Sequence, residues 1–176
     1  LMNLHRKTVV LLHGHGADDT IWEYLDASLN DNYTIVRPNI SLLTSCQTIE
    51  EYAEELHRFL TSANITKFTL IGHSMGGYIA LAFAEKYPNL LEGFGLIHST
   101  AYADDEAKKQ QRTQVIELLN NFGTESFVKN TAGNLFGPRF KELYPEKLQA
   151  HIARYSKLPA QALIAGIVAM RERPDR

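Results

Sequence analysis

Two kinds of hydrophobic pattern alternate along the first hundred residues. Short, nearly continuous apolar runs predict buried strands, at 8–12, 33–36, 68–71 and 93–97. Between these runs, apolar residues recur at the spacing of a helix with one buried face, at 21–29, 49–60 and 75–87. Strands that alternate with helices of this length predict an α/β fold, in which a parallel sheet has helices on both faces.

The pattern changes after Ala101, where no further strand is predicted. The expected elements are a charged helix, a looser segment with several glycines and two further helices, at 104–121, 122–140, 145–157 and 159–173. The chain is therefore predicted to have a sheet-containing core at 1–100 and an all-helical part at 101–173.

The predicted third strand runs directly into Gly72-x-Ser74-x-Gly76, and a helical pattern follows at once. This context predicts a nucleophile elbow, in which the serine sits on a sharp strand-to-helix turn with its hydroxyl exposed above the sheet. Glycines flank the serine because side chains there would collide with the neighbouring strand or helix. A glycine-rich turn with a purely structural role is the less favoured alternative. Ser74 is thus the candidate nucleophile.

A second motif follows the first predicted strand, which ends in His13-Gly14-His15-Gly16. Acyl transfer at a serine needs donors aimed at the developing oxyanion, one from the residue after the nucleophile and one from the loop after an earlier strand. The backbone N–H groups of Met75 and His15 are the candidates for these donors.

Together, the two motifs resemble those of the α/β-hydrolase superfamily, particularly its small esterase-like and C–C-hydrolase-like members with HGxG and GHSMGG motifs. The resemblance covers the whole chain in order. It implies a serine hydrolase acting on a small ester, thioester or C–C bond, and it makes the helical part at 101–173 a cap that roofs the active site. One departure lies at 38–45, which lacks the glycines of the family's loop.

Serine becomes a good nucleophile only when a base takes its proton and a carboxylate orients that base. In this family both follow the nucleophile on later strands, so the chain is expected to lack the acid and base and to be inactive by itself. His98, at the end of the fourth predicted strand, is the one histidine considered as a substitute base. A substrate-lining role is favoured for it, as for Gly14, and helix capping is favoured for Asp104 and Asp105.

Composition narrows the expected partners to a small-molecule substrate. The net charge is −2 and the pI about 6.4, so no basic surface for nucleic acid is expected. No apolar run approaches the ~20 residues that span a membrane, and no signal peptide is visible, which favours the cytoplasm. His, Cys, Asp and Glu show no metal-ligand spacing, and Gly14-His15-Gly16 lacks a dinucleotide pattern, so neither metal nor cofactor is expected.

Two functional classes stay open at this point. One is a serine hydrolase, and the other is a non-catalytic module of the same fold that binds a ligand. The intact motif around Ser74 favours the first, because a binding module has no need of an exposed serine there. The strand at 93–97 is also expected to form an open apolar sheet edge, through which chains could associate with one another.

Overall fold

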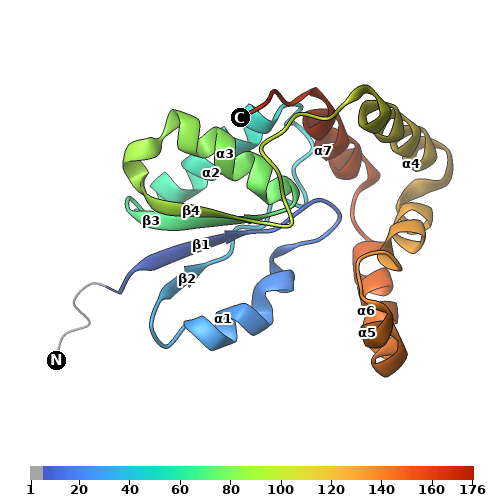
Figure 1. Ribbon diagram of the computed structural model, residues 1–176, viewed down its shortest axis with the longest axis horizontal. Coiled ribbons are helices and arrows are strands. Elements are labelled where there is room, and N and C mark those ends of the chain that lie inside the picture. Colours follow the sequence, from blue (N-terminus) through green and yellow to red (C-terminus); the bar gives the residue numbers. More distant parts are fainter. Residues whose placement is uncertain (1–5) are drawn as a thin grey trace.

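The computed structural model describes residues 6–176 and contains a parallel, four-stranded sheet in the order β2-β1-β3-β4 (Figure 1). The strands lie close to the predicted positions, at Thr8–Leu12 (β1), Thr34–Val36 (β2), Phe68–His73 (β3) and Leu91–Ile97 (β4). Because all strands run the same way, the ends of β1 and β3 meet at one edge of the sheet, where the candidate motifs begin.

Helices cover both faces of the sheet, as the alternating pattern predicts (Figure 1). One face carries α2 (Ile49–Ser62) and α3 (Met75–Lys86), and the other carries α1 (Glu23–Leu29) with the short 3-10 turn η1 (Asp19–Trp22). A second 3-10 turn, η2 (Pro88–Leu90), leads from α3 into β4.

The main core lies between the sheet and the α2–α3 layer. Residues of β3 alternate between this core and the opposite face, and Phe68 and Leu70 on the core side are fully buried. Phe83 of α3 is also fully buried, and its ring lies 5.7 Å from that of Phe68. Burying side chains of this size stabilises the fold by roughly 1.5–3 kcal/mol each. The third strand therefore anchors the elbow at its carboxyl end.

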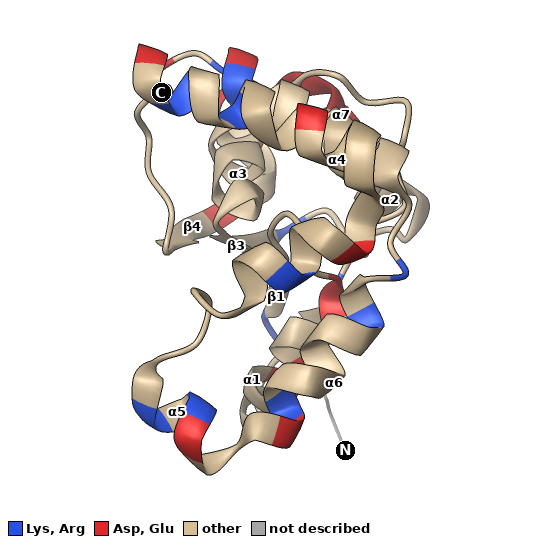
Figure 2. Cartoon of the chain, turned by 90° about the vertical axis from the view of Figure 1, so that its right-hand side faces the viewer, with Lys and Arg blue, Asp and Glu red and all other residues tan. Residues whose placement is uncertain are grey.

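The residues after β4 form four helices, which we call the cap: α4 (Glu106–Ala132), α5 (Pro138–Leu143), α6 (Pro145–Tyr155) and α7 (Ala160–Glu172). Figure 2 views the cap from outside, with α4 and α7 on the side of α3 and α6 in front of α1; acidic and basic residues are interspersed over it. None of the helices in the described range combines the length and hydrophobicity needed to cross a membrane.

The cap differs from the prediction in the segment expected to be loose, which contains the second part of α4 and the start of the unpredicted helix α5. A loose segment was expected to begin at residue 122, but helix α4 continues to Ala132 across a kink at Gly123, which has φ 80°. The continuation is stabilised by burial, because Phe127, Val128 and Ala132 pack into the core. A glycine at positive φ permits the change of direction between the two helical parts.

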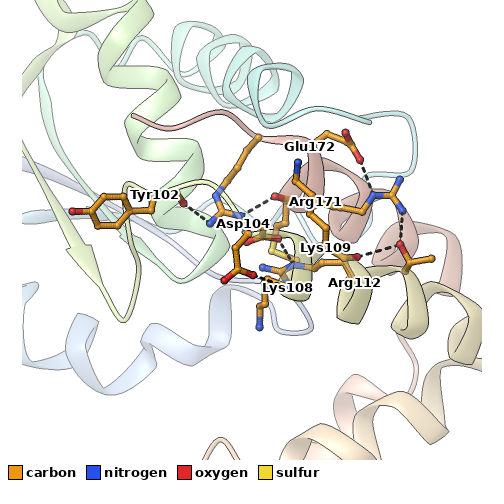
Figure 3. A network of polar contacts seen from close by, with 11 residues as sticks. Tyr102, Asp104, Lys108, Lys109, Arg112, Arg171 and Glu172 are labelled. Atoms are coloured by element: carbon orange, nitrogen blue, oxygen red, sulfur yellow. Dashed lines mark hydrogen bonds and ion pairs between the residues drawn. The ribbon is translucent and has the colours of Figure 1, made fainter.

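An ion-pair network joins the two ends of the cap to each other (Figure 3). Asp104, just before α4, accepts from Arg112 at 2.9 Å and from Arg173, just after α7, at 2.7 Å. Arg173 also donates to the carbonyl of Tyr102 and lies over the ring of Tyr78. Asp104 and Arg173 are almost fully buried, so their pairing fixes where the cap leaves and rejoins the core.

Strand β4 forms one edge of the sheet, and its apolar side chains are partly exposed. Phe94 is 50% and Leu96 36% exposed, whereas comparable positions on β3 are buried. Self-association through this edge stays a prediction.

Candidate active site

Ser74 occupies the sharp turn between β3 and α3 and has an unusual backbone conformation. Its φ is 53° and its ψ −117°, outside the regions that L-residues ordinarily adopt. The Ser74 N–H donates to the carbonyl of Ile97 at 3.0 Å, and the Ser74 carbonyl accepts from the hydroxyl of Ser99 at 2.8 Å. Backbone strain of this kind costs roughly 1–3 kcal/mol and persists where surrounding bonds hold it.

Close packing explains the glycines around Ser74. A Cβ atom on Gly72 would lie far inside van der Waals distance of the Gly76 carbonyl, and one on Gly76 would overlap the carbonyl oxygen of Leu12 in β1. Gly77 has the same constraint from Ser99, which the motif alone did not reveal. The elbow is therefore closely packed against β1, β3 and the segment after β4.

The loop after β1, residues 13–18, lies directly against the elbow, and we call it the oxyanion loop. A Cβ atom on Gly14 would be 3.1 Å from the Cβ of Ser74. The buried ring of His13 accepts from the N–H of Ile40 at 3.0 Å through Nε2 and donates from Nδ1 to the Gly14 carbonyl at 2.8 Å. Burial lowers the pKa of His13, so its ring is neutral and can fill both roles.

His15 extends from this loop under the cap. Its Nε2 donates to the carbonyl of Leu163 in α7 at 2.8 Å, and its ring meets the edge of Phe127 in α4. Burial lowers the pKa of His15 to about 4, which keeps the ring uncharged at neutral pH. The sequence motif pointed only to the backbone of this residue, and nothing in the sequence indicated its side-chain partners.

The other end of the oxyanion loop is held by helix α6. Asp18 caps η1 by accepting from the N–H of Thr20 and also accepts from Arg154 and Tyr155 of the cap. Burial raises the pKa of Asp18, but the hydrogen bonds from Arg154 and Thr20 outweigh it, and the net pKa lies below the usual value. The carboxylate is therefore ionised. Sequence reasoning did not single out this group.

An open cavity of about 690 Å³ lies above Ser74, between the oxyanion loop and α1 on one side and α5 and α6 on the other. Its wall is mainly apolar and rich in rings, contributed by Trp22, Tyr24, Phe136, Phe140, His151 and Tyr155. Ser74 and His15 both line it, so the candidate nucleophile and one candidate donor residue face the same space.

No histidine ring nitrogen within residues 6–176 forms a hydrogen bond with the Ser74 hydroxyl, although His73 and His151 line the same cavity as Ser74. His57 stacks on Tyr87, and the rings of His73 and His98 meet edge to face at 6.1 Å. His98 is exposed at φ 47° and lies outside the lining of the cavity, so its role in substrate binding stays a prediction.

The acids after β4 have structural roles in the described range. Asp105 caps α4 by accepting from the N–H of Lys108, and Asp104 belongs to the buried ion-pair network in Figure 3. Within residues 6–176, no group of three His, Cys, Asp or Glu side chains has the arrangement of a metal site.

Comparison with known proteins identifies the family. The sequence profile of the alpha/beta hydrolase fold matches residues 7–157. The chain belongs to the α/β-hydrolase family. The expected fold is thereby confirmed: a parallel sheet with helices, followed by a helical region, is the α/β-hydrolase fold.

This α/β hydrolase is similar to a thermophilic esterase from Thermogutta terrifontis, with 27% identity, a TM-score of 0.89 and coverage of 96% of this chain and 65% of the esterase. It is similar in fold to an enol-lactonase from Burkholderia xenovorans, with 17% identity, a TM-score of 0.86 and coverage of 96% and 66%. A pyrrolizixenacetamide deacetylase from Xenorhabdus hominickii is 31% identical over 110 residues, 58% of this chain and 41% of the deacetylase. The chain thus spans about two thirds of the solved structures and less than half of this curated relative.

Proposed function

We propose that this α/β hydrolase is a serine hydrolase that cleaves a small ester, thioester or related acyl or C–C bond. Ser74 is the nucleophile, and the backbone N–H groups of His15 and Met75 form the oxyanion hole. The observation that carries the proposal is the backbone of Ser74, which is held at φ 53° at the start of α3 and at the base of a cavity. Strain of this kind is concentrated at functional sites.

The proposed reaction follows from this arrangement. The Ser74 oxygen attacks the substrate carbonyl carbon, and the carbonyl oxygen becomes a tetrahedral oxyanion. The N–H groups of His15 and Met75 donate to that oxyanion, and each donor contributes roughly 3 kcal/mol to transition-state stabilisation. Expulsion of the leaving group forms an acyl-enzyme, which water then hydrolyses.

The base that deprotonates Ser74 is proposed to lie outside the described residues. The support for this is that no histidine ring nitrogen within residues 6–176 forms a hydrogen bond with the Ser74 hydroxyl. Without a base, only weak catalysis is left, so residues 1–176 alone are expected to be inactive. Relatives that are named as an esterase and a deacetylase favour hydrolysis of an acyl bond to oxygen or nitrogen.

The cavity supports a substrate with an apolar or aromatic group. Aromatic side chains from both the core and the cap line it, and apolar surface dominates its wall. Such walls bind substrates mainly through burial of apolar area, while a few polar groups fix orientation. A 4-nitrophenyl ester with a short acyl chain is therefore a suitable first substrate.

The test compares the Ser74→Ala variant with wild type in the protein expressed from the whole gene. Hydrolysis of 4-nitrophenyl butyrate is expected to fall by about 1000-fold or more, and labelling by a fluorophosphonate probe is expected to disappear. Ser62→Ala, at the exposed end of α2, is the matched control and should leave both unchanged.

Two outcomes would contradict the proposal. An unchanged rate in Ser74→Ala would exclude the mechanism, and a wild-type protein that binds ligand in the cavity without labelling or turnover would support the non-catalytic alternative. Rapid labelling of residues 1–176 alone would place a base within them, with His98 the first residue to substitute.

A further inference from the structure

The cap contacts the oxyanion loop through helix α7 and the second part of α4. The His15 ring donates from Nε2 to the Leu163 carbonyl at 2.8 Å, and its centroid lies 5.7 Å from that of Phe127, at an interplanar angle of 76°. In Figure 1 the loop that follows β1 extends from the sheet towards these helices. One side of the candidate site thus depends on residues more than a hundred positions further along the chain.

Helix α7 approaches both residues that would supply the oxyanion donors. A Cβ atom on Gly166 would lie 2.8 Å from Cδ2 of His15 and 3.4 Å from the sulfur of Met75. A side chain at this position would have to displace the His15 ring or the helix, so the close approach depends on glycine. The same turn of α7 therefore contacts His15 through Leu163 and both His15 and Met75 through Gly166.

The oxyanion loop has little conformational rigidity of its own around His15. The residue is flanked by Gly14 and Gly16, and Gly16 has φ 74°. Glycine leaves the backbone a wide choice of conformations. The peptide that carries the His15 N–H is restricted at its carbonyl, because the Gly14 C=O accepts from His13 Nδ1 at 2.8 Å. Contacts of the His15 side chain restrict the same peptide from its other end, on the side of the cap.

The hydrogen bond from the His15 ring is specific. The ring lies partly buried between α4, α7 and the core, where an N–H without a partner would lose part of its hydration without compensation. Asp18, three residues later, is held by Arg154 and Tyr155 of α6 in the same way. The cap therefore fixes the loop on both sides of Gly16.

We propose that the His15 side chain is a positioning group, which helix α7 holds so that the backbone N–H of the same residue points at the oxyanion. The oxyanion hole then forms only while the cap is seated on the core. This inference rests on the proposed function, because it concerns the donor that acyl transfer at Ser74 would use. A misplacement of about 1 Å at a catalytic group can cost roughly 100-fold in rate.

The test uses variants that retain the backbone N–H and change only its attachment to α7. His15→Phe keeps a ring against Phe127 but loses the donor to Leu163, and kcat is expected to fall about 10- to 100-fold while KM changes less than about twofold. His15→Gln keeps an N–H donor and should recover most of kcat. His57→Phe, on α2 and stacked on Tyr87, is the matched control and should match wild type.

Inhibition by a transition-state analogue is a measurement that a purely structural role of His15 would not change selectively. A trifluoromethyl ketone forms a tetrahedral adduct with the serine and requires the oxyanion donors, whereas a carboxylate product does not require them to the same extent. For His15→Phe, the inhibition constant of the ketone should rise in proportion to the loss in kcat/KM, with product inhibition unchanged. Gly166→Ala should produce the same pattern by pressing on the ring from α7.

The outcomes separate this inference from the proposed function. Wild-type kcat and ketone affinity in His15→Phe, in a protein whose Ser74 is essential, would overturn the inference alone. Equal losses of ketone and product binding together with a lower melting temperature would assign His15 a structural role and also overturn it. If Ser74→Ala retains activity, the proposed function itself is wrong.

Discussion

The nucleophile elbow and the oxyanion loop lie side by side but are held in different ways. The elbow is fixed by backbone contacts, since Ser74 bonds to Ile97 and the glycines pack against β1 and Ser99. The oxyanion loop is held at its start by the His13 ring, which bonds to Gly14 and Ile40. Further along it is held by His15 and Asp18, whose side chains reach the cap. One candidate site thus rests on two parts of the molecule, and substitutions should be able to disturb one part without the other.

The largest effect is expected where the elbow meets β1. Gly76→Ala would place a methyl group against the Leu12 carbonyl oxygen, and backbone cannot move aside without disrupting the sheet. We expect a loss of about 4 kcal/mol or more in the free energy of unfolding, measured by urea denaturation. Gly133→Ala is the matched control, because nothing lies within 4 Å of its Cβ position and its φ is −61°. Equal stability of the two variants would refute the close-packing explanation.

The second prediction concerns a substitution that weakens the attachment of the cap but leaves the elbow intact. Asp104→Asn leaves the buried guanidinium of Arg173 without its counter-charge, which should cost about 3 kcal/mol of unfolding free energy. Hydrogen exchange should accelerate at α7 and in the oxyanion loop, and much less at 72–77. Glu117→Gln, at an exposed position on α4, serves as the control for loss of a carboxylate. Equal acceleration at the elbow would mean that the two regions are not separable.

The pH dependence of the Asp104 contribution has a definite sign. Burial raises the pKa of Asp104, but its bonds to Arg112 and Arg173 outweigh this, and the net pKa lies below the usual value. Its stabilising effect is therefore complete above the pKa of the unfolded chain and is lost as the pH falls through the folded value. The difference between wild type and Asp104→Asn should shrink in acid.

The third prediction concerns the attachment of the loop through His15. Its pKa is lowered by burial from 6.5 to about 4, so above pH 6.5 the ring is neutral in both folded and unfolded states. Between pH 6.5 and about 4, the ring is protonated in the unfolded chain but stays neutral in the native protein. The free energy of unfolding therefore falls by up to about 3 kcal/mol. His15→Phe has no imidazole at this position and so lacks this loss of unfolding free energy. Its stability relative to wild type should therefore improve as the pH falls from 6.5 to 4.

Unfolding of wild type and His15→Phe at a series of pH values measures this difference. The burial-lowered pKa values of His13, His73 and His151 act in the same direction in both proteins and cancel in the comparison. A constant difference across the range would mean that the His15 ring takes up a proton as easily in the native state as in the unfolded chain.

The smallest effect is expected at the other attachment of the loop. Tyr155→Phe removes a buried hydroxyl that bonds to Asp18 at 3.1 Å, and should cost about 1 kcal/mol of unfolding free energy. Arg154→Ala should cost less, because the arginine side chain is 53% exposed and its ion pair with Asp18 is screened by solvent. If Arg154→Ala lost more unfolding free energy than Tyr155→Phe, Arg154 rather than Tyr155 would be the main partner that holds the loop.

Most of the core was predictable from short stretches of sequence. The runs at 8–12 and 68–71, which lie in β1 and β3, are mostly apolar, and such runs are typical of a sheet covered on both faces. The start of α2 is also local, because Thr48 and Glu51 have the spacing of a capping box and the Thr48 hydroxyl accepts from the Glu51 N–H. These features are readable because each depends on residues close together in the chain.

The cap was less predictable, and the difference has a physical cause. Residues 122–132 look loose in sequence because Gly123 breaks the pattern, but burial of Phe127 and Val128 stabilises a further helical part. The role of Asp104 was likewise missed, because its partner Arg173 is 69 positions away. Helix capping, which was favoured for both aspartates, holds for Asp105.

The sequence by itself determined the fold family and the position of the elbow. A glycine-flanked serine between an apolar strand and a helix is a local arrangement, and its steric requirements involve neighbouring residues. Only the tertiary structure decided what holds the oxyanion loop, because the His15 ring bonds to a carbonyl 148 positions away. A main-chain carbonyl accepts a hydrogen bond whatever side chain its residue carries, so such a contact leaves neither a motif nor a periodicity in the sequence.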